Sequence, residues 1–254
     1  MFMHADAATQ RLQAGALDVA EAGARLTCRL LDFRLSRQTQ SEHARVLVAP
    51  PLAILSAAVQ QPDTVFSGSG AAQHVALPQL QVCLKALSTT IRFLEDPSAT
   101  EPASYQSCVV AAIEASWPVL QALAASPLAA KPGVSAGVAE VISAAFSAAG
   151  DQRGALIQPS FEALHQLFLV QASAGPLESI AKMAELSGEG SGVTAEQQKA
   201  MQQGLVAFVQ AAHAATLPPN PADIDVVAAM LTVLARWACF HPLSLVEGLS
   251  LIHI

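Results

Sequence analysis

The sequence predicts an all-α fold in which antiparallel helix pairs stack on one another. Alanine supplies much of the 52% hydrophobic content of the 254 residues, and alanine is the strongest helix former. Apolar residues recur every three or four positions along most of the chain, which is typical of amphipathic helices. No run alternates apolar and polar residues for long enough to predict a sheet.

The apolar helices are expected to begin near residues 78, 104, 134, 153, 176, 195 and 221. Residues 46–62 predict a further core helix despite Pro50 and Pro51. Each helix places its apolar residues on one face. The predicted core stripes are Leu80/Leu84/Leu87/Ile91/Leu94, Val109/Ile113/Trp117/Leu120, Val134/Val138/Val141/Ile142/Ala145/Phe146, Ile157/Phe161/Leu164/Phe168, Leu205/Phe208/Val209/Ala212 and Ile224/Val227/Leu231/Leu234/Ala238.

Short segments rich in Pro, Gly and Ser separate the helices, among them EDPSATEPAS, SPLAAKPG, LSGEGSG and LPPNPAD. Asp96, Asp151, Thr194 and Asn220 lie near helix starts, where their side chains can accept free amide protons. Alternate helix starts give steps of 42 residues (134 to 176) and 45 residues (176 to 221). Two-helix repeats of about 40–47 residues are typical of HEAT and armadillo arrays, and a globular multi-helix bundle is the alternative.

Trp117 and Pro118 are neighbours inside one predicted helix, although an interior proline costs about 3 kcal/mol. In a stack, Pro118 would kink the helix to follow the curvature while Trp117 fills the space between layers. Pro159 lies early in the 153–171 helix, where its missing amide proton is expected to cost little. We interpret all three as structural residues.

The charge is unevenly distributed along the chain. Residues 1–92 hold 8 basic and 6 acidic side chains (+2), and residues 93–254 hold 5 basic and 14 acidic ones (−9). This balance argues against nucleic acid as a direct partner, since nucleic acid requires clustered Lys and Arg. The best membrane candidate, residues 46–62, is short and is broken by Pro50 and Pro51, so no membrane span or membrane partner is expected.

No catalytic, metal-binding or cofactor-binding site is predicted, and the chain is not expected to be an enzyme. Glu162-x-x-His165 has the spacing of a di-iron helix motif but lacks a second such pair. The glycine-rich stretches 67–74 and 187–192 lack the features of nucleotide loops. The four cysteines (Cys28, Cys83, Cys108 and Cys239) form no C-x-x-C pair and are interpreted as buried free thiols in a reducing compartment. The start has no signal-peptide pattern.

Four segments, CLKALSTTIRFLEDPS, WPVLQAL, GALIQPSFEALHQLF and PADIDVVAAMLTVLARWACFHPLSL, follow one another in an order and spacing that resemble a known family. This family is the transportin-SR/importin-13 branch of the importin-β (karyopherin-β) nuclear transport receptors. The resemblance covers residues 77–248, and residues 1–76 are weakly matched helical repeats. LSLIHI, residues 249–254, is interpreted as an adapter-derived scar, so the chain is expected to be an internal-to-C-terminal fragment.

The resemblance implies a right-handed superhelical solenoid of HEAT-like helix pairs that binds protein cargo and releases it when Ran-GTP binds. Ran-GTP would bind through repeats mostly outside this chain, nucleoporins would be further partners, and the protein would shuttle between cytoplasm and nucleus. A HEAT scaffold that organises a signalling or phosphatase complex is the alternative. An arginine ladder of the family falls on Gly137, Glu140, Ser143 and Ser147, none of which is basic. Glu140, Ser143 and Ser147 form a polar stripe opposite the apolar face of this helix, which makes them a candidate cargo-facing stripe, and an ordinary solvated face is the alternative. Without basic residues in the ladder, RS-domain cargo is not expected.

Overall fold

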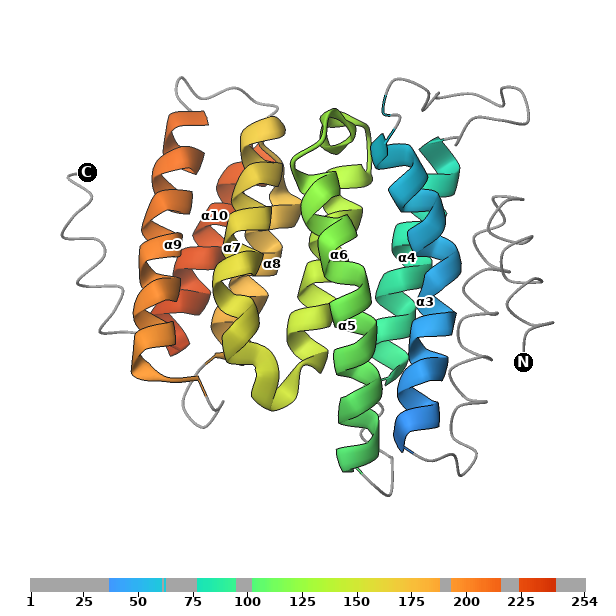
Figure 1. Ribbon diagram of the computed structural model, residues 1–254. Coiled ribbons are helices and arrows are strands. Elements are labelled where there is room, and N and C mark those ends of the chain that lie inside the picture. Colours follow the sequence, from blue (N-terminus) through green and yellow to red (C-terminus); the bar gives the residue numbers. More distant parts are fainter. Residues whose placement is uncertain are drawn as a thin grey trace. The chain divides into compact units, whose positions relative to one another are not determined.

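The computed structural model describes residues 37–60, 62, 77–94, 102–187, 193–215 and 224–240, which form helices and turns and contain no strand. The prediction of an all-α fold is confirmed for these ranges (Figure 1). The described α-helices are α3 (Arg37–Gln60), α4 (Leu77–Leu94), α5 (Pro102–Ala124), α6 (Val134–Ala148), α7 (Arg153–Val170), α8 (Ala174–Leu186), α9 (Ala195–Ala215) and α10 (Ile224–Phe240). The proposed scar at 249–254 lies outside the described residues.

The predicted helix starts agree with the structure to within three residues. The observed starts from α4 to α10 are 77, 102, 134, 153, 174, 195 and 224. The segment 46–62 falls largely within α3, which includes Pro50 and Pro51. Apolar periodicity and Pro/Gly breaks are local signals, which explains why they locate the helices well.

The chain divides into two compact units. Unit 1 is Met1–Ala149 and unit 2 is Gly150–Ile254. In unit 1, α3 and α5 lie side by side in one layer and α4 and α6 lie behind them (Figure 1). In unit 2, α7 and α9 form one layer and α8 and α10 form the other.

The same packing rule holds within each unit. The most extensive helix contacts join second neighbours in sequence: α3 with α5 and α4 with α6 in unit 1, α7 with α9 and α8 with α10 in unit 2. In an up-down-up-down bundle the second neighbours would instead lie across the diagonal. Each unit is therefore a stack of two antiparallel helix hairpins.

Most of the predicted core stripes are buried. Every described member of the stripes on α4, α6 and α7 is buried, and so are Leu205 and Phe208 on α9. On α5, Val109, Ile113 and Leu120 are buried. These faces supply the apolar area that holds the hairpins together.

The stripe predicted on α10 is wrong. Ile224 and Leu231 are 65% and 59% exposed, and Val227 and Leu234 are only half-buried. The buried face of α10 consists of Val226, Ala229, Val233 and Trp237. Both faces of this helix are apolar, so periodicity alone predicted a stripe but could not select the side that packs on α8.

The start of α9 confirms the capping role predicted for Thr194. The Thr194 amide donates to Gln197 Oε1 at 2.8 Å, and the Gln197 amide donates to Thr194 Oγ1 at 3.3 Å. This reciprocal pair is a capping box, which satisfies two otherwise free amides. The residue directly before α7 is Gln152, and the side chain of Asp151 is not among those described, so its capping role stays a prediction. Asp96 and Asn220 lie outside the described residues.

Replacing Thr194 with alanine is expected to lower the free energy of unfolding by about 1 kcal/mol, because α9 loses its cap. Urea denaturation monitored by circular dichroism measures the change. Thr232→Ala is the matched control, because the Thr232 hydroxyl only donates back to the Ala228 carbonyl within α10 and should be close to neutral. Equal losses in the two variants would contradict the capping role.

The two prolines with predicted structural roles lie inside helices, at positions that reach solvent. Pro118 is exposed and Pro159 is half-buried. Pro159 is the seventh residue of α7 and lies beyond the first turn, so the reason predicted for the low cost of its missing amide proton, a position early in the helix, is wrong. The carbonyl oxygens left without helical donors belong to Glu114 and Ala155, which are exposed residues where water can bind instead.

Candidate functional site

The predicted cargo-facing stripe lies on α6, whose position is fixed against α4. The helix follows Gly133, which has φ = +75°, a left-handed conformation that favours glycine. Next to this turn, Gln81 Nε2 donates to the Pro132 carbonyl at 2.8 Å. A Cβ on Gly133 would lie 2.7 Å from the same Gln81 nitrogen. A side chain at 133 would therefore displace the contact that ties this turn to α4.

A second glycine brings the two helices close together. A Cβ on Gly137 would lie 2.8 Å from Leu84 Cδ1, and Leu84 is buried. Leu84 fills the space that this missing side chain leaves open. Glu140 follows one turn later on the same side of α6 and therefore faces α4.

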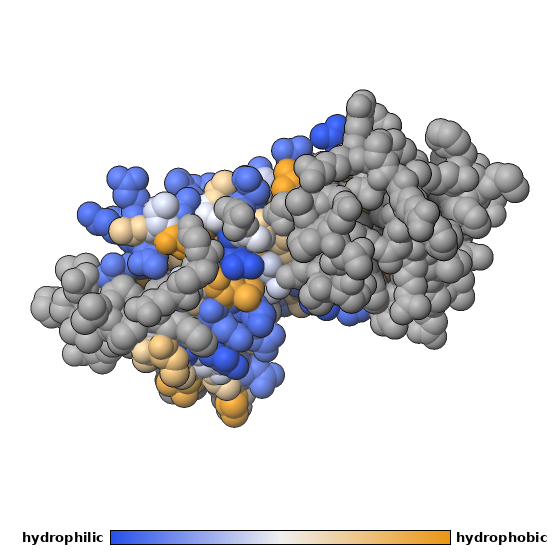
Figure 2. All heavy atoms as spheres, turned by 90° about the horizontal axis from the view of Figure 1, so that it is seen from below, coloured by the Kyte–Doolittle hydropathy of each residue, from blue (hydrophilic) through white to orange (hydrophobic). Residues whose placement is uncertain are grey.

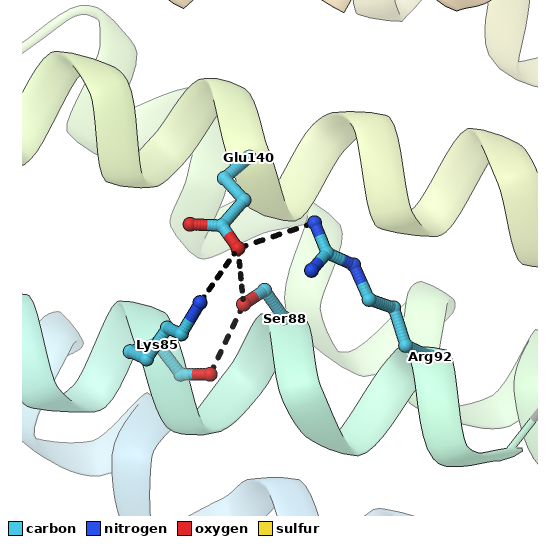
Figure 3. A network of polar contacts seen from close by, with 4 residues as sticks. All are labelled: Lys85, Ser88, Arg92 and Glu140. Carbon is cyan, nitrogen blue, oxygen red and sulfur yellow. Dashed lines mark hydrogen bonds and ion pairs between the residues drawn. The ribbon is translucent and has the colours of Figure 1, made fainter. Parts of the chain in front are cut away.

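Glu140 is the centre of a charge cluster that joins α4 and α6 (Figure 3). Glu140 Oε1 lies 3.1 Å from Lys85 Nζ and 3.1 Å from Arg92 Nη2. The Ser88 hydroxyl lies 3.0 Å from the Lys85 carbonyl and 3.4 Å from Glu140 Oε1, so it shares one proton between two acceptors. With two cations and one carboxylate, this cluster of Lys85, Ser88, Arg92 and Glu140 has a formal charge of +1.

The cluster is partly exposed to solvent, which limits its energy. The Glu140 side chain is 33% exposed and both cations are more exposed than that. An exposed ion pair contributes about 0–1 kcal/mol, and salt screens it. The cluster therefore fixes the orientation of these side chains more than it stabilises the fold.

The three residues of the predicted stripe lie on α6, and all of them are half-buried: Glu140, Ser143 and Ser147. Glu140 is already paired with α4, which the sequence did not predict. Lys85, Ser88 and Arg92 lie three and four residues apart and so share one face of α4. Their spacing in the sequence predicts that they share a face of α4, but only the packing of α6 on α4 brings that face to Glu140.

Trp117 lies in unit 1 on α5 and is half-buried. Its ring nitrogen Nε1 is enclosed and has no hydrogen-bond partner. A buried N–H without a partner costs about 1–3 kcal/mol. The role proposed for this residue, filling the space between layers, stays a prediction.

Glu162 and His165 on α7 contact different residues. Glu162 accepts a hydrogen bond from Gln158 Nε2 at 3.0 Å, and the His165 ring packs 5.4 Å from the Phe208 ring centre. No group of three or more His, Cys, Asp or Glu side chains in the described ranges could hold a metal ion. No helix there is long and apolar enough to cross a membrane.

An open groove of about 330 Å³ runs between α7 and α9 in unit 2. Its polar lining includes Gln158, Glu162, Glu196 and Gln197, and Pro159 forms part of its wall. Gln197 is held in the capping box and Gln158 is bonded to Glu162, so three of these four groups already have partners.

Cys83 is a buried thiol on α4 whose pKa burial raises to about 12, because the interior disfavours the thiolate. A thiol reagent near pH 8 should therefore leave Cys83 unmodified in the folded chain and modify it in urea, since the thiolate is the nucleophile. Cys239 is exposed, so the prediction of a buried thiol is wrong at this position, and the reagent should modify it in both conditions. Peptide mapping by mass spectrometry reads the two sites separately, and modification of folded Cys83 at the rate of Cys239 would contradict the burial.

The raised pKa of Cys83 also makes stability depend on pH. The unfolded chain ionises this thiol near its ordinary pKa, whereas the folded chain keeps it neutral up to about pH 12. The stabilisation from burying the neutral thiol is therefore complete below the unfolded pKa and is lost as pH rises towards 12.

No protein-family model, no curated protein and no solved structure matches this chain. Its function is therefore argued from the fold and from the α4–α6 face.

Proposed function

We propose that this chain is part of a nuclear import receptor that binds protein cargo on a right-handed superhelical HEAT solenoid and releases it when Ran-GTP binds. The proposal combines the resemblance of residues 77–248 to the transportin-SR/importin-13 branch with the packing of the described helices. It includes shuttling between cytoplasm and nucleus and contacts with nucleoporins.

The observation that carries the proposal is the contact between second-neighbour helices in both units. In a HEAT array the first helices of successive pairs stack in one layer and the second helices stack in another. The pairs α3/α5 and α7/α9, with α4/α6 and α8/α10 behind them, follow this scheme within their units. Helix starts at 134, 174 and 224 in alternate helices give steps of 40 and 50 residues, near the period of such arrays.

The face formed by α4 and α6 is the cargo surface in this proposal. It combines the charge cluster with Ser143 and Ser147, all of them partly exposed apart from Ser88. Glu140 holds Lys85 and Arg92 in place, so a partner meets ordered cations. Ordered charges at an interface contribute to specificity and to the association rate.

A pull-down with the full-length receptor, with and without GTP-locked Ran, tests the function. Cargo should bind without Ran and dissociate when GTP-locked Ran is added. Cargo binding that is unchanged by GTP-locked Ran would overturn the transport proposal and favour the scaffold alternative. The expected result depends on the transport cycle and not on the helical fold, so correct folding alone does not satisfy the test.

A charge reversal tests the proposed surface separately. Arg92→Glu should weaken cargo binding at least about tenfold, because it removes a cation and places a second carboxylate beside Glu140. Lys199→Glu is the matched control, since Lys199 is exposed on α9 in unit 2 and changes the net charge equally. Equal weakening in both variants would show a net-charge effect and would exclude this face as the cargo surface.

A further inference from the structure

Helix α10 has an exposed apolar stripe opposite its buried face. The stripe consists of Ile224, Ala228, Leu231, Ala235 and Ala238, all of which are exposed. Figure 2 shows that hydrophobic residues reach the surface between hydrophilic ones and gather in patches in the described part of the molecule. Single exposed apolar residues are ordinary, but five in a row on one helix face are typical of a contact surface.

The spacing of the stripe predicts which kind of partner fits it. Its members are separated by four, three, four and three residues, which is the a/d spacing of two helices that pack along each other. From Ile224 to Ala238 the stripe extends about 21 Å along the helix axis. A partner helix of similar length could cover it completely.

The order of large and small residues favours a second copy of α10 in the antiparallel direction. With Leu231 at the two-fold axis, Ile224 of each copy lies opposite Ala238 of the other. Large residues then face small ones at both ends, and the two Leu231 side chains meet in the middle. A two-fold axis requires such a self-complementary surface.

The charges beside the stripe favour the same direction. Asp225 and Arg236 are exposed, and eleven residues of helix place them on the same side of α10 near opposite ends. An antiparallel copy brings Asp225 of one chain towards Arg236 of the other, twice by symmetry. A parallel two-fold copy would carry the charged side of each helix to opposite flanks of the interface and would form neither pair. The existing pair of Arg236 with Glu185 is long at 3.4 Å and exposed, so Arg236 can be shared.

We propose that this chain forms a two-fold dimer through the exposed stripe of α10, with the two helices antiparallel. One pair of helices buries less area than a standard protein interface, so the dimer is weak and forms at high protein concentration. The inference does not rest on the proposed function. If the chain is monomeric and still releases cargo when Ran-GTP binds, only the dimer proposal is overturned. If the chain dimerises but its cargo binding does not change with Ran-GTP, only the transport proposal is overturned.

Sedimentation velocity over a wide range of protein concentration tests the dimer. The unaltered chain should shift from monomer to dimer, and Leu231→Glu should weaken the association at least about tenfold, because two carboxylates then face each other at the axis. Gln203→Glu, at an exposed position of α9, is the matched control and should leave the association unchanged. Circular dichroism checks that each variant is folded.

A charge swap tests the direction of the helices. Asp225→Arg and Arg236→Asp should each weaken the dimer, and the double variant should restore it, since each copy then offers the opposite charge to the other. A chain that stays monomeric at every concentration overturns the proposal, whether the stripe stays bare or is covered by another segment of the same chain. A dimer that survives Leu231→Glu, or one that the double variant fails to restore, overturns it as well.

Discussion

Replacing Trp237 with alanine is expected to lower the free energy of unfolding by about 3–5 kcal/mol, the largest effect of any single substitution considered for this chain. Trp237 is 1% exposed, and its ring packs edge-to-face on Phe161 with centroids 6.5 Å apart. Truncation removes the transfer energy of the indole and leaves a cavity beside Phe161 that the surrounding side chains fill only in part. Urea denaturation monitored by circular dichroism measures the loss.

Trp117→Phe is the matched control, because the chain has two tryptophans and one lies in each unit. Trp117 is half-buried with a ring N–H that lacks a partner, so its loss removes some packing but also removes an unsatisfied donor. The net change should stay within about 1 kcal/mol. Fluorescence of this variant then reports Trp237 alone. A larger loss for Trp117→Phe than for Trp237→Ala would contradict the core assignment.

Replacing Gly204 with alanine is expected to destabilise the chain by about 1–2 kcal/mol, although alanine favours a helix over glycine by about 1 kcal/mol. A Cβ on Gly204 would lie 2.6 Å from Cδ1 of Phe161. The Phe161 ring has little freedom to move, since it also packs on Phe208 and Trp237 with centroids 6.4 Å and 6.5 Å apart. The strain of overpacking therefore exceeds the gain in helix propensity.

A second substitution separates overpacking from other causes. In the Gly204→Ala background, Phe161→Leu should cost less than it does alone, because the smaller side chain makes room for the new methyl group. Thermal unfolding of the four chains of this cycle gives the coupling energy. Additive losses would exclude the contact with Phe161, and a net gain for Gly204→Ala alone would show that α7 and α9 can move apart freely.

The helices could be predicted from the sequence because the signals that define them are local. Alanine content, apolar spacing and Pro/Gly breaks located the start of each helix from α4 to α10 within three residues. The capping role of Thr194 was also local, since its partner Gln197 lies three residues away. At α7 the residue before the helix is Gln152, whose side chain makes no capping hydrogen bond.

The candidate site was predicted only in part. Glu140, Ser143 and Ser147 were identified on one face of one helix, but the cations that pair with Glu140 come from α4, about fifty positions earlier. Such a pairing depends on Gly133 and Gly137, which let α6 approach α4 closely. The sequence does not show which side chain lies in the space beside either glycine.

The sequence by itself determined the helical class, the starts of the helices from α4 to α10 and the capping of α9, because each depends on residues within one or two turns of one another. Only the tertiary structure decided that second neighbours pack together, that Trp237 is buried while Leu231 is exposed, and that Glu140 meets Lys85 and Arg92. The physical reason lies in α10 itself. A helix that is apolar on two sides gains a similar free energy from burying either one, so the neighbouring helices select the buried face.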